Sequence, residues 1–138
     1  MKKLNKNLCI IALSYLASTS IAFASSNMSQ QDLSVVLSQA VASVNAQTPM
    51  SLDDDTRLDS AATARKLLIY NNTMINYEAD ELDAKIFSEN VQTLVIEPLC
   101  TNPDLAIFKE LKVTMVYRYL GKNGAFIAEL SKDMGTCP

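Results

Sequence analysis

The first 24 residues determine where this chain can fold and how much of it takes part in the fold. Three lysines precede an apolar run over residues 8–16, and the segment ends in Ala-Phe-Ala at residues 22–24. This order is typical of a secretory signal peptide. The apolar run is also shorter than the roughly 20 residues of a membrane-spanning helix. We therefore expect cleavage after Ala24 and export through the inner membrane, to the periplasm or as a secreted protein. The alternative is a retained anchor.

Cleavage would change both the length and the charge of the chain. It leaves 114 of the 138 residues, which suits a single domain over residues 25–138. The removed segment holds three lysines and no acidic residue, so nine basic side chains remain against fifteen acidic ones, a net charge of −6. A protein this acidic repels nucleic acid and anionic lipid. We expect neither as a partner, and no membrane insertion after cleavage.

Two of the three cysteines, Cys100 and Cys137, remain after cleavage, whereas Cys9 leaves with the signal peptide. An even number of cysteines in an exported protein indicates a disulfide. The alternative is a pair of free thiols. In the chain-entropy model, a loop of this length stabilises the folded state by about 3–4 kcal/mol.

The composition excludes several kinds of functional site. The sequence has no histidine, so Ser-His-Asp and Cys-His nucleophilic sites and histidine-ligated metals cannot form. Its three glycines are too few and too widely spaced for a Walker loop or a dinucleotide-binding motif. We therefore expect no cofactor and no metal, and our hypothesis is that the protein is not an enzyme.

The spacing of apolar residues predicts the order of helices and strands. Offsets typical of one helical stripe predict a helix over residues 31–46. Alternating patterns predict four strands, over residues 57–61, 66–75, 113–120 and 125–130. A second helix should end before Pro98, and Asn102-Pro103 should begin a third. The expected fold is α+β: a two-layer sandwich with an antiparallel sheet of two hairpins and about three helices on one face, in the order α-ββ-αα-ββ.

The densest group of charges is a candidate interaction surface. It comprises Asp53, Asp54, Asp55, Arg57 and Asp59. Counted from Asp53, the residues do not have the spacing of an EF-hand calcium loop, because there is no glycine at the sixth position and Ala64 stands where the loop needs a glutamate at the twelfth. We therefore interpret residues 53–55 as a solvated loop. Alternation along a strand should then place Arg57 between Asp55 and Asp59, and Arg118 could meet a carboxylate across the sheet.

Three tyrosines fall on predicted strands. Tyr70 could pair across strands with Tyr117 or Tyr119, which would add under about 1 kcal/mol beyond burial. The alternative is that these tyrosines form an exposed aromatic face for a partner. Packing within the sheet is the interpretation that we prefer.

Several short motifs together point to a family. They are residues 55–60 (DTRLDS), residues 68–73 (LIYNNT), Pro98-Leu99-Cys100, residues 116–119 (VYRY) and Cys137. With this order of motifs the chain resembles small exported proteobacterial proteins grouped as quorum-sensing-regulated virulence factors. The resemblance implies a small two-layer fold, export, one disulfide and a link to virulence. It supplies no catalytic residue, and Asn72 stands where the family more often has an aromatic residue.

Three functional hypotheses follow from these observations. We prefer a small, exported, non-enzymatic binding module that is associated with virulence and acts on a protein partner. The first alternative is a periplasmic accessory, or pilotin-like subunit, of an envelope or secretion machine. The second is a hydrolase that uses two carboxylates, although no pair among the fifteen acidic residues stands out.

The signal-peptide interpretation predicts the mass of the exported protein. Its first residue should be at or near Ser25, because the small residues at 22–24 form the cleavage site. Intact-mass measurement on protein from the periplasm or medium checks this. Protein that retains residues 1–24 in those fractions would show that the segment is not cleaved.

Overall fold

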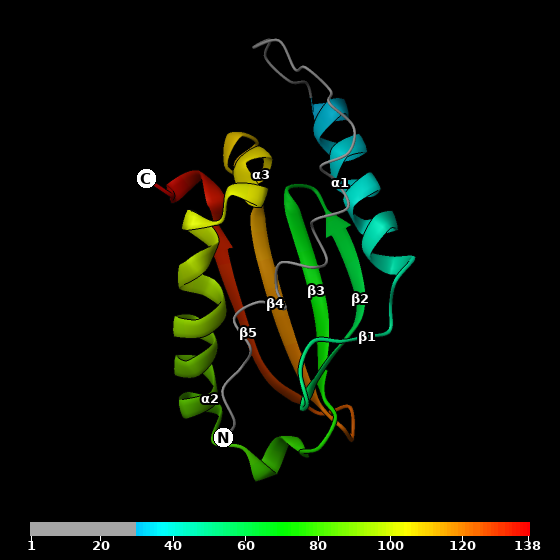
Figure 1. Ribbon diagram of the computed structural model, residues 1–138, viewed down its shortest axis with the longest axis vertical. Helices are drawn as coiled ribbons and strands as arrows, with labels where there is room; N and C mark the ends of the chain where they lie inside the picture. The colour runs from blue at the N-terminus through cyan, green and yellow to red at the C-terminus, as the bar shows by residue number, and fades with distance from the viewer. Residues whose placement is uncertain (1–29) are drawn as a thin grey trace.

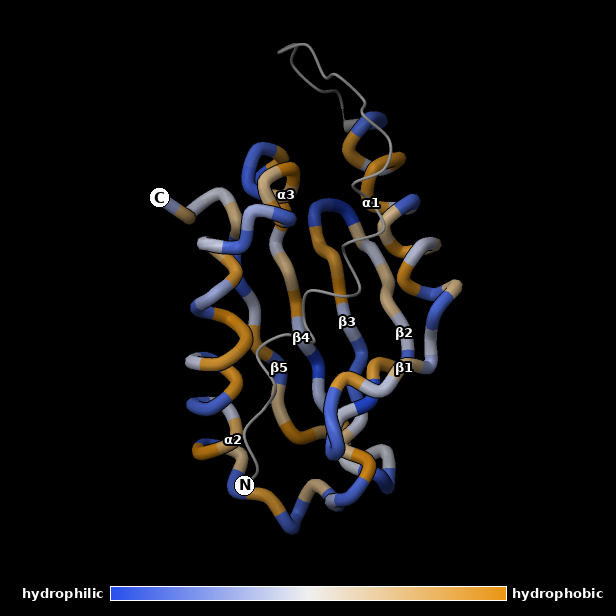
Figure 2. The backbone as a smooth tube through the Cα atoms, in the orientation of Figure 1, coloured by the Kyte–Doolittle hydropathy of each residue, from blue (hydrophilic) through white to orange (hydrophobic). Residues whose placement is uncertain are grey.

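Helix α1 (Gln30–Asn45) is the first element of residues 30–138, the part of the chain that the computed structural model describes (Figure 1). The expected signal peptide lies outside these residues. The helix was predicted almost to the residue from its apolar stripe. Leu37, Ala40 and Val44 on that stripe are buried, and Figure 2 shows hydrophobic and hydrophilic residues alternating along the helix.

The strands form one five-stranded sheet in the order β1-β2-β3-β4-β5. Their bounds are β1 (Met50–Ser51), β2 (Thr56–Ala64), β3 (Leu67–Met74), β4 (Thr114–Gly121) and β5 (Phe126–Asp133). The α+β class and the two hairpins, β2–β3 and β4–β5, are confirmed. The wholly antiparallel sheet is wrong, because β3 and β4 pair in parallel and the sheet is mixed. Parallel neighbours need a long crossover, and here the helical segment between β3 and β4 provides it.

That crossover contains six short helical elements. They are the 3₁₀ helix Ala79–Glu81, α2 (Ala84–Val91), the π-helical turn Gln92–Ile96, the 3₁₀ helices Glu97–Thr101 and Pro103–Leu105, and α3 (Ala106–Glu110). Asp83 caps α2 by accepting from the N–H groups of Lys85 and Ile86. The expected end before Pro98 is confirmed, because α2 ends at Val91 and the π-helical turn after it ends at Ile96. Pro98 lies in the first turn of the following 3₁₀ helix, where its missing N–H is no loss. The predicted cap at Asn102 is confirmed, at 2.9 Å from the N–H of Asp104.

Aromatic residues at the centre of the sheet face the helices. Tyr70 on β3 stacks on Tyr117 of β4 with ring centroids 5.2 Å apart, so the cross-strand pair expected from the sequence is present. Tyr119 meets Phe87 of α2 edge-on, with centroids 5.1 Å apart. All four rings are buried, which supports packing over an exposed aromatic face.

Asn45, the last residue of α1, holds the edge of β2. Its Nδ2 donates to the carbonyl of Ala61 at 2.9 Å, and the N–H of Ala61 donates to Asn45 Oδ1 at 2.7 Å. The short strand β1 covers β2 only opposite Arg57 and Leu58. The amide of Asn45 therefore takes the position that a further strand would occupy beside Ala61.

Cys100 and Cys137 form a disulfide with their Cα atoms 5.2 Å apart. The bond ties the crossover to the turn Met134–Thr136 that follows β5. Met134 in this turn is buried, and its N–H donates to the carbonyl of Val113. The chain end is thus held by the disulfide, by apolar packing and by a backbone hydrogen bond.

Loss of the disulfide should destabilise the protein without unfolding it. We expect Cys100→Ser or Cys137→Ser to lower the free energy of unfolding by about 2–4 kcal/mol, because the unfolded chain gains the freedom of the open loop. The double variant should cost no more than either single one. Denaturant titration of the three variants checks this, and thiol titration of denatured exported protein checks the bond itself. Two free thiols in that protein would contradict the pairing.

Candidate functional site

Within the described residues, the helices cover one face of the sheet. Buried side chains from α1, α2 and α3 join one set of strand residues in a single hydrophobic core. Because side chains alternate along a strand, the residues between them point to the opposite side. We call this second side the open face. It consists of Arg57, Asp59, Ser60 and Ala62 on β2, Ile69, Asn71 and Thr73 on β3, Val116, Arg118 and Leu120 on β4, and Phe126, Glu129 and Ser131 on β5.

The strand register arranges the open face in rows across the sheet. One row is largely apolar and contains Ala62, Ile69, Val116 and Ser131. The middle row is polar and contains Ser60, Asn71, Arg118 and Glu129. The third row runs through Arg57, Thr73, Leu120 and Phe126. The open face therefore combines apolar side chains with charges of both signs, which is the composition of many reversible protein interfaces.

Two ion pairs lie on the open face. Arg118 Nε is 2.7 Å from Glu129 Oε2, so the expected contact between Arg118 and a carboxylate is confirmed. Arg57 pairs with Asp59, whose other oxygen accepts from the hydroxyl of Thr73. These four charged side chains are 31–45% exposed. Ion pairs this exposed contribute under about 1 kcal/mol each, so a partner could displace them at little cost.

Arg57 does not lie between two carboxylates as expected. Asp55 precedes the first residue of β2 and therefore lies in a loop, not on the strand face. There its Oδ1 accepts from Asn76 Nδ2 at 2.7 Å. A register shift between Leu58 and Ser60 also changes the alternation on which the expectation rested.

Phe126 is the residue of this face that sequence reasoning missed. It is 61% exposed, the most exposed of the large hydrophobic residues in the described part of the chain. It pairs with Leu120 at a second register shift, between Tyr119 and Leu120. The alternating pattern placed Phe126 near the start of a strand. The register shift, however, determines on which face of the sheet its side chain lies, and it cannot be read from the alternation. No sequence signal marked it.

The aspartates at residues 53–55 form a hydrogen-bonded loop at one end of the sheet. Asp53 Oδ1 accepts from the N–H groups of Asp55, at 2.8 Å, and Thr56, at 2.7 Å. Asp54 is exposed, and its carbonyl accepts from Asn76. Among the described residues no three acidic or cysteine side chains converge as metal ligands would. The five residues predicted as one surface are thus divided between this loop and the open face.

The surroundings of Glu81 lower the pKa of its carboxyl. The N–H of Glu78 donates to Glu81 Oε2 at 2.6 Å, and Lys122 Nζ lies 3.4 Å from the same oxygen. The hydrogen bond from Glu78, with a smaller contribution from Lys122, holds the pKa of the Glu81 carboxyl below its ordinary value. A general acid needs a raised pKa, so this environment stabilises a carboxylate and does not prepare a proton donor.

None of the helices in residues 30–138 has both the length and the apolar character that a membrane span requires.

The two neighbouring aspartates allow a matched test of the loop. Asp53→Ala should lower the free energy of unfolding by about 1–2 kcal/mol, because two backbone N–H groups lose a charged acceptor. Asp54→Ala should change it by less than about 0.5 kcal/mol, since no side-chain bond is lost. Denaturant titration compares the two variants at equal net charge. Equal losses would show that charge, and not the hydrogen bonds of Asp53, governs the loop.

Comparison with known proteins identifies the fold. No family model matches the sequence, and no curated protein matches it either. Among solved structures, a candidate secreted protein from Pseudomonas aeruginosa is 17% identical, with a TM-score of 0.66 over 82% of this chain and 99% of that one. The type II secretion-system pilotin EpsS from Vibrio vulnificus is 13% identical (TM-score 0.63, 79% of this chain and 94% of that one). The pilotin AspS of the same type of system in Vibrio cholerae is 14% identical (TM-score 0.60, 78% and 94%). At such identities the similarity shows that this chain has the fold of these small bacterial proteins.

Proposed function

We propose that this protein is an exported, non-enzymatic binding module that acts as a pilotin-like accessory of a secretion machine. The observation that carries the proposal is the fold, which matches two type II pilotins over 94% of their chains. A protein with that role needs a surface for a protein partner and no catalytic group. The open face supplies such a surface.

The open face has two properties that suit a reversible interface. Phe126 projects into solvent beside Leu120 and provides an aromatic anchor of the kind that contributes most to binding. Arg118 lies on the neighbouring strand β4, and Arg57 lies on β2 in the same row as Phe126. Both can exchange an exposed intramolecular partner for one on another protein. In this proposal Arg57 and Asp59 act as part of the open face, and Asp53, Asp54 and Asp55 form its acidic border.

Export is supported by two independent features. The N-terminal segment has the order of a signal peptide, and the disulfide needs an oxidising compartment to persist. Both are compatible with the periplasm, where an accessory of an envelope machine would act.

A secreted binding protein is the second candidate function. The candidate secreted protein from Pseudomonas aeruginosa favours it, since that structure covers 82% of this chain. The resemblance to the quorum-sensing-regulated proteins adds a link to virulence. The two candidates differ in location and in partner, and one experiment can therefore separate them.

The test is capture by the tagged protein in its native cells after in-cell cross-linking. A component of a secretion system should be recovered from the envelope fraction. Phe126→Asp should reduce its recovery at least tenfold, because a charge replaces the aromatic anchor. Ile86→Asp is the matched control, since Ile86 is 52% exposed on α2 and away from the open face. It should leave recovery unchanged.

Each contrary outcome has a definite meaning. Accumulation in the medium with no envelope partner would favour the secreted candidate. Equal loss with both variants, or none with either, would show that the open face is not the interface. Hydrolytic turnover that a single acidic-to-alanine substitution abolishes would replace both candidates with the carboxylate hydrolase.

A further inference from the structure

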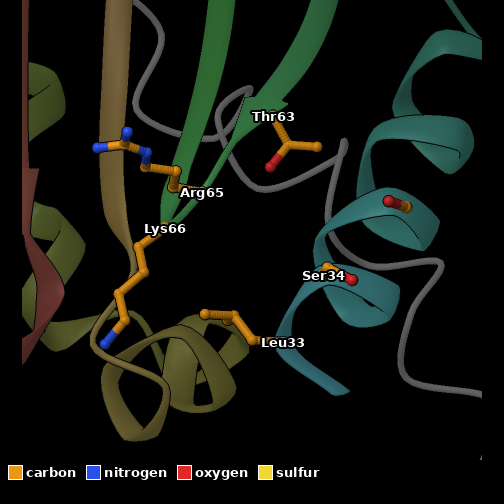
Figure 3. A pocket seen from close by; sticks show the side chains of 6 residues that line it. Leu33, Ser34, Thr63, Arg65 and Lys66 are labelled. Atoms are coloured by element: carbon orange, nitrogen blue, oxygen red, sulfur yellow. The ribbon is translucent and has the colours of Figure 1, made fainter. Parts of the chain in front are cut away.

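The turn between β2 and β3 forms one wall of a pocket of about 370 Å³. Leu33, Ser34 and Ser38 of α1 line one side, and Thr63, Arg65 and Lys66 line the other. Figure 3 shows Thr63 on its strand opposite Ser34 on the helix, and Leu33 reaching from the helix toward the turn. The side chains of Arg65 and Lys66 extend from the turn with their charged ends directed away from α1. No acidic side chain lines the pocket.

Three side chains at the pocket carry donors that have no acceptor within the described residues. Of the basic side chains in the described residues, Arg57, Lys85, Arg118 and Lys122 form ion pairs, and Lys109 donates to a backbone carbonyl. Arg65, Lys66, Lys112 and Lys132 have neither kind of partner within that part of the chain. Of these four cations only Arg65 and Lys66 line the pocket. The hydroxyl of Ser38 also has no hydrogen-bond partner among the described residues. A protein with six more acidic than basic side chains after residue 24 thus places two adjacent cations, neither of them in an ion pair, at this pocket.

The backbone of the turn holds Arg65 in a conformation that is unusual for a long side chain. Ala64 pairs with Leu67, so Arg65 and Lys66 form a two-residue hairpin loop. Such loops favour asparagine or glycine because a residue there must adopt a positive φ. Arg65 has φ of 57°, which disfavours a long side chain. The hydroxyl of Thr63 donates a hydrogen bond to the carbonyl of Leu67. The N–H of Thr114 on β4 donates to the carbonyl of Lys66. The turn is therefore held both by β2 and by β4.

The edge of β2 suggests the kind of molecule that would bind here. At this edge the side chain of Asn45 forms hydrogen bonds with the N–H and the carbonyl of Ala61. Backbone groups repeat their direction every second residue along a strand, so those of Thr63 point to the same edge, beside the pocket. An extended peptide can pair with such groups, while Leu33 offers an apolar wall and Arg65 and Lys66 offer cations to a carboxylate.

We propose that this pocket binds an extended acidic peptide segment of a partner protein, with its carboxylates at Arg65, Lys66 and Ser38. This site is separate from the open face. It therefore goes beyond the proposed function, and either can fail without the other.

The probe is an acetylated hexapeptide that ends in Leu-Glu-Glu with a free carboxylate, titrated into ¹⁵N-labelled protein and followed by NMR. Saturable shift changes should centre on the amides of Ser38, Thr63, Arg65 and Lys66, and the affinity should fall as salt rises. The peptide that ends in Leu-Gln-Gln-amide should bind at least tenfold more weakly.

The double variant Arg65→Asn/Lys66→Gln separates binding from folding. Asparagine tolerates a positive φ better than arginine does, so the melting temperature should stay the same or rise while affinity falls at least tenfold. Lys112→Asn/Lys132→Gln is the control, since Lys112 also has a positive φ, of 52°, and both side chains lie outside the pocket. It should bind within twofold of the original chain. The single variant Lys66→Gln should weaken binding in a fully native turn.

Three results of the peptide titrations would overturn the proposal. They are equal binding of the acidic and amide peptides, equal loss of affinity in the pocket and control variants, and shift changes centred on the open face. Inorganic phosphate serves as a further probe. If phosphate alone bound as tightly as the acidic peptide, the pocket would be a general anion site and the peptide assignment would be wrong.

Discussion

The parallel pairing of β3 with β4 is the constraint on which the rest of the structure depends. Because the two strands run in the same direction, the chain must return to the starting end of the sheet before β4 begins. The crossover that does this contains α2, α3 and Cys100. It covers one face of β4 and β5, while α1 covers β2 on the same side. The face that no described helix covers and the site of the disulfide both follow from this single pairing.

The local elements could be predicted from the sequence, but the contacts between distant segments could not. Leu37, Ala40 and Val44 specify α1 by their spacing alone, and two cysteines in an exported chain allow one disulfide. The alternation of apolar and polar residues shows which residues of β3 and β4 share a face of the sheet. This pattern is the same whether the two strands are parallel or antiparallel, so the sequence did not predict the parallel pair. Phe126 was missed for a related reason, since the register shift beside Leu120 depends on the partner strand.

On the central strands β3 and β4, alternate residues pack in the core and lie on the open face. Tyr70 and Tyr117 stack in the core, whereas their neighbours Asn71 and Arg118 lie side by side on the open face. The residues proposed for binding therefore make few of the contacts that hold the protein together.

The two hydrogen bonds between Asn45 and Ala61 affect how copies of this protein can associate at high concentration. An exposed strand edge is a template on which a second molecule can extend the sheet, and repeated extension produces fibres. At β2 that template is interrupted by a side chain in place of a strand. A second copy could add a long strand there only by first pulling away the last residue of α1. One asparagine at a helix end thus blocks this edge at Ala61 and prevents a second copy from extending the sheet along its whole length.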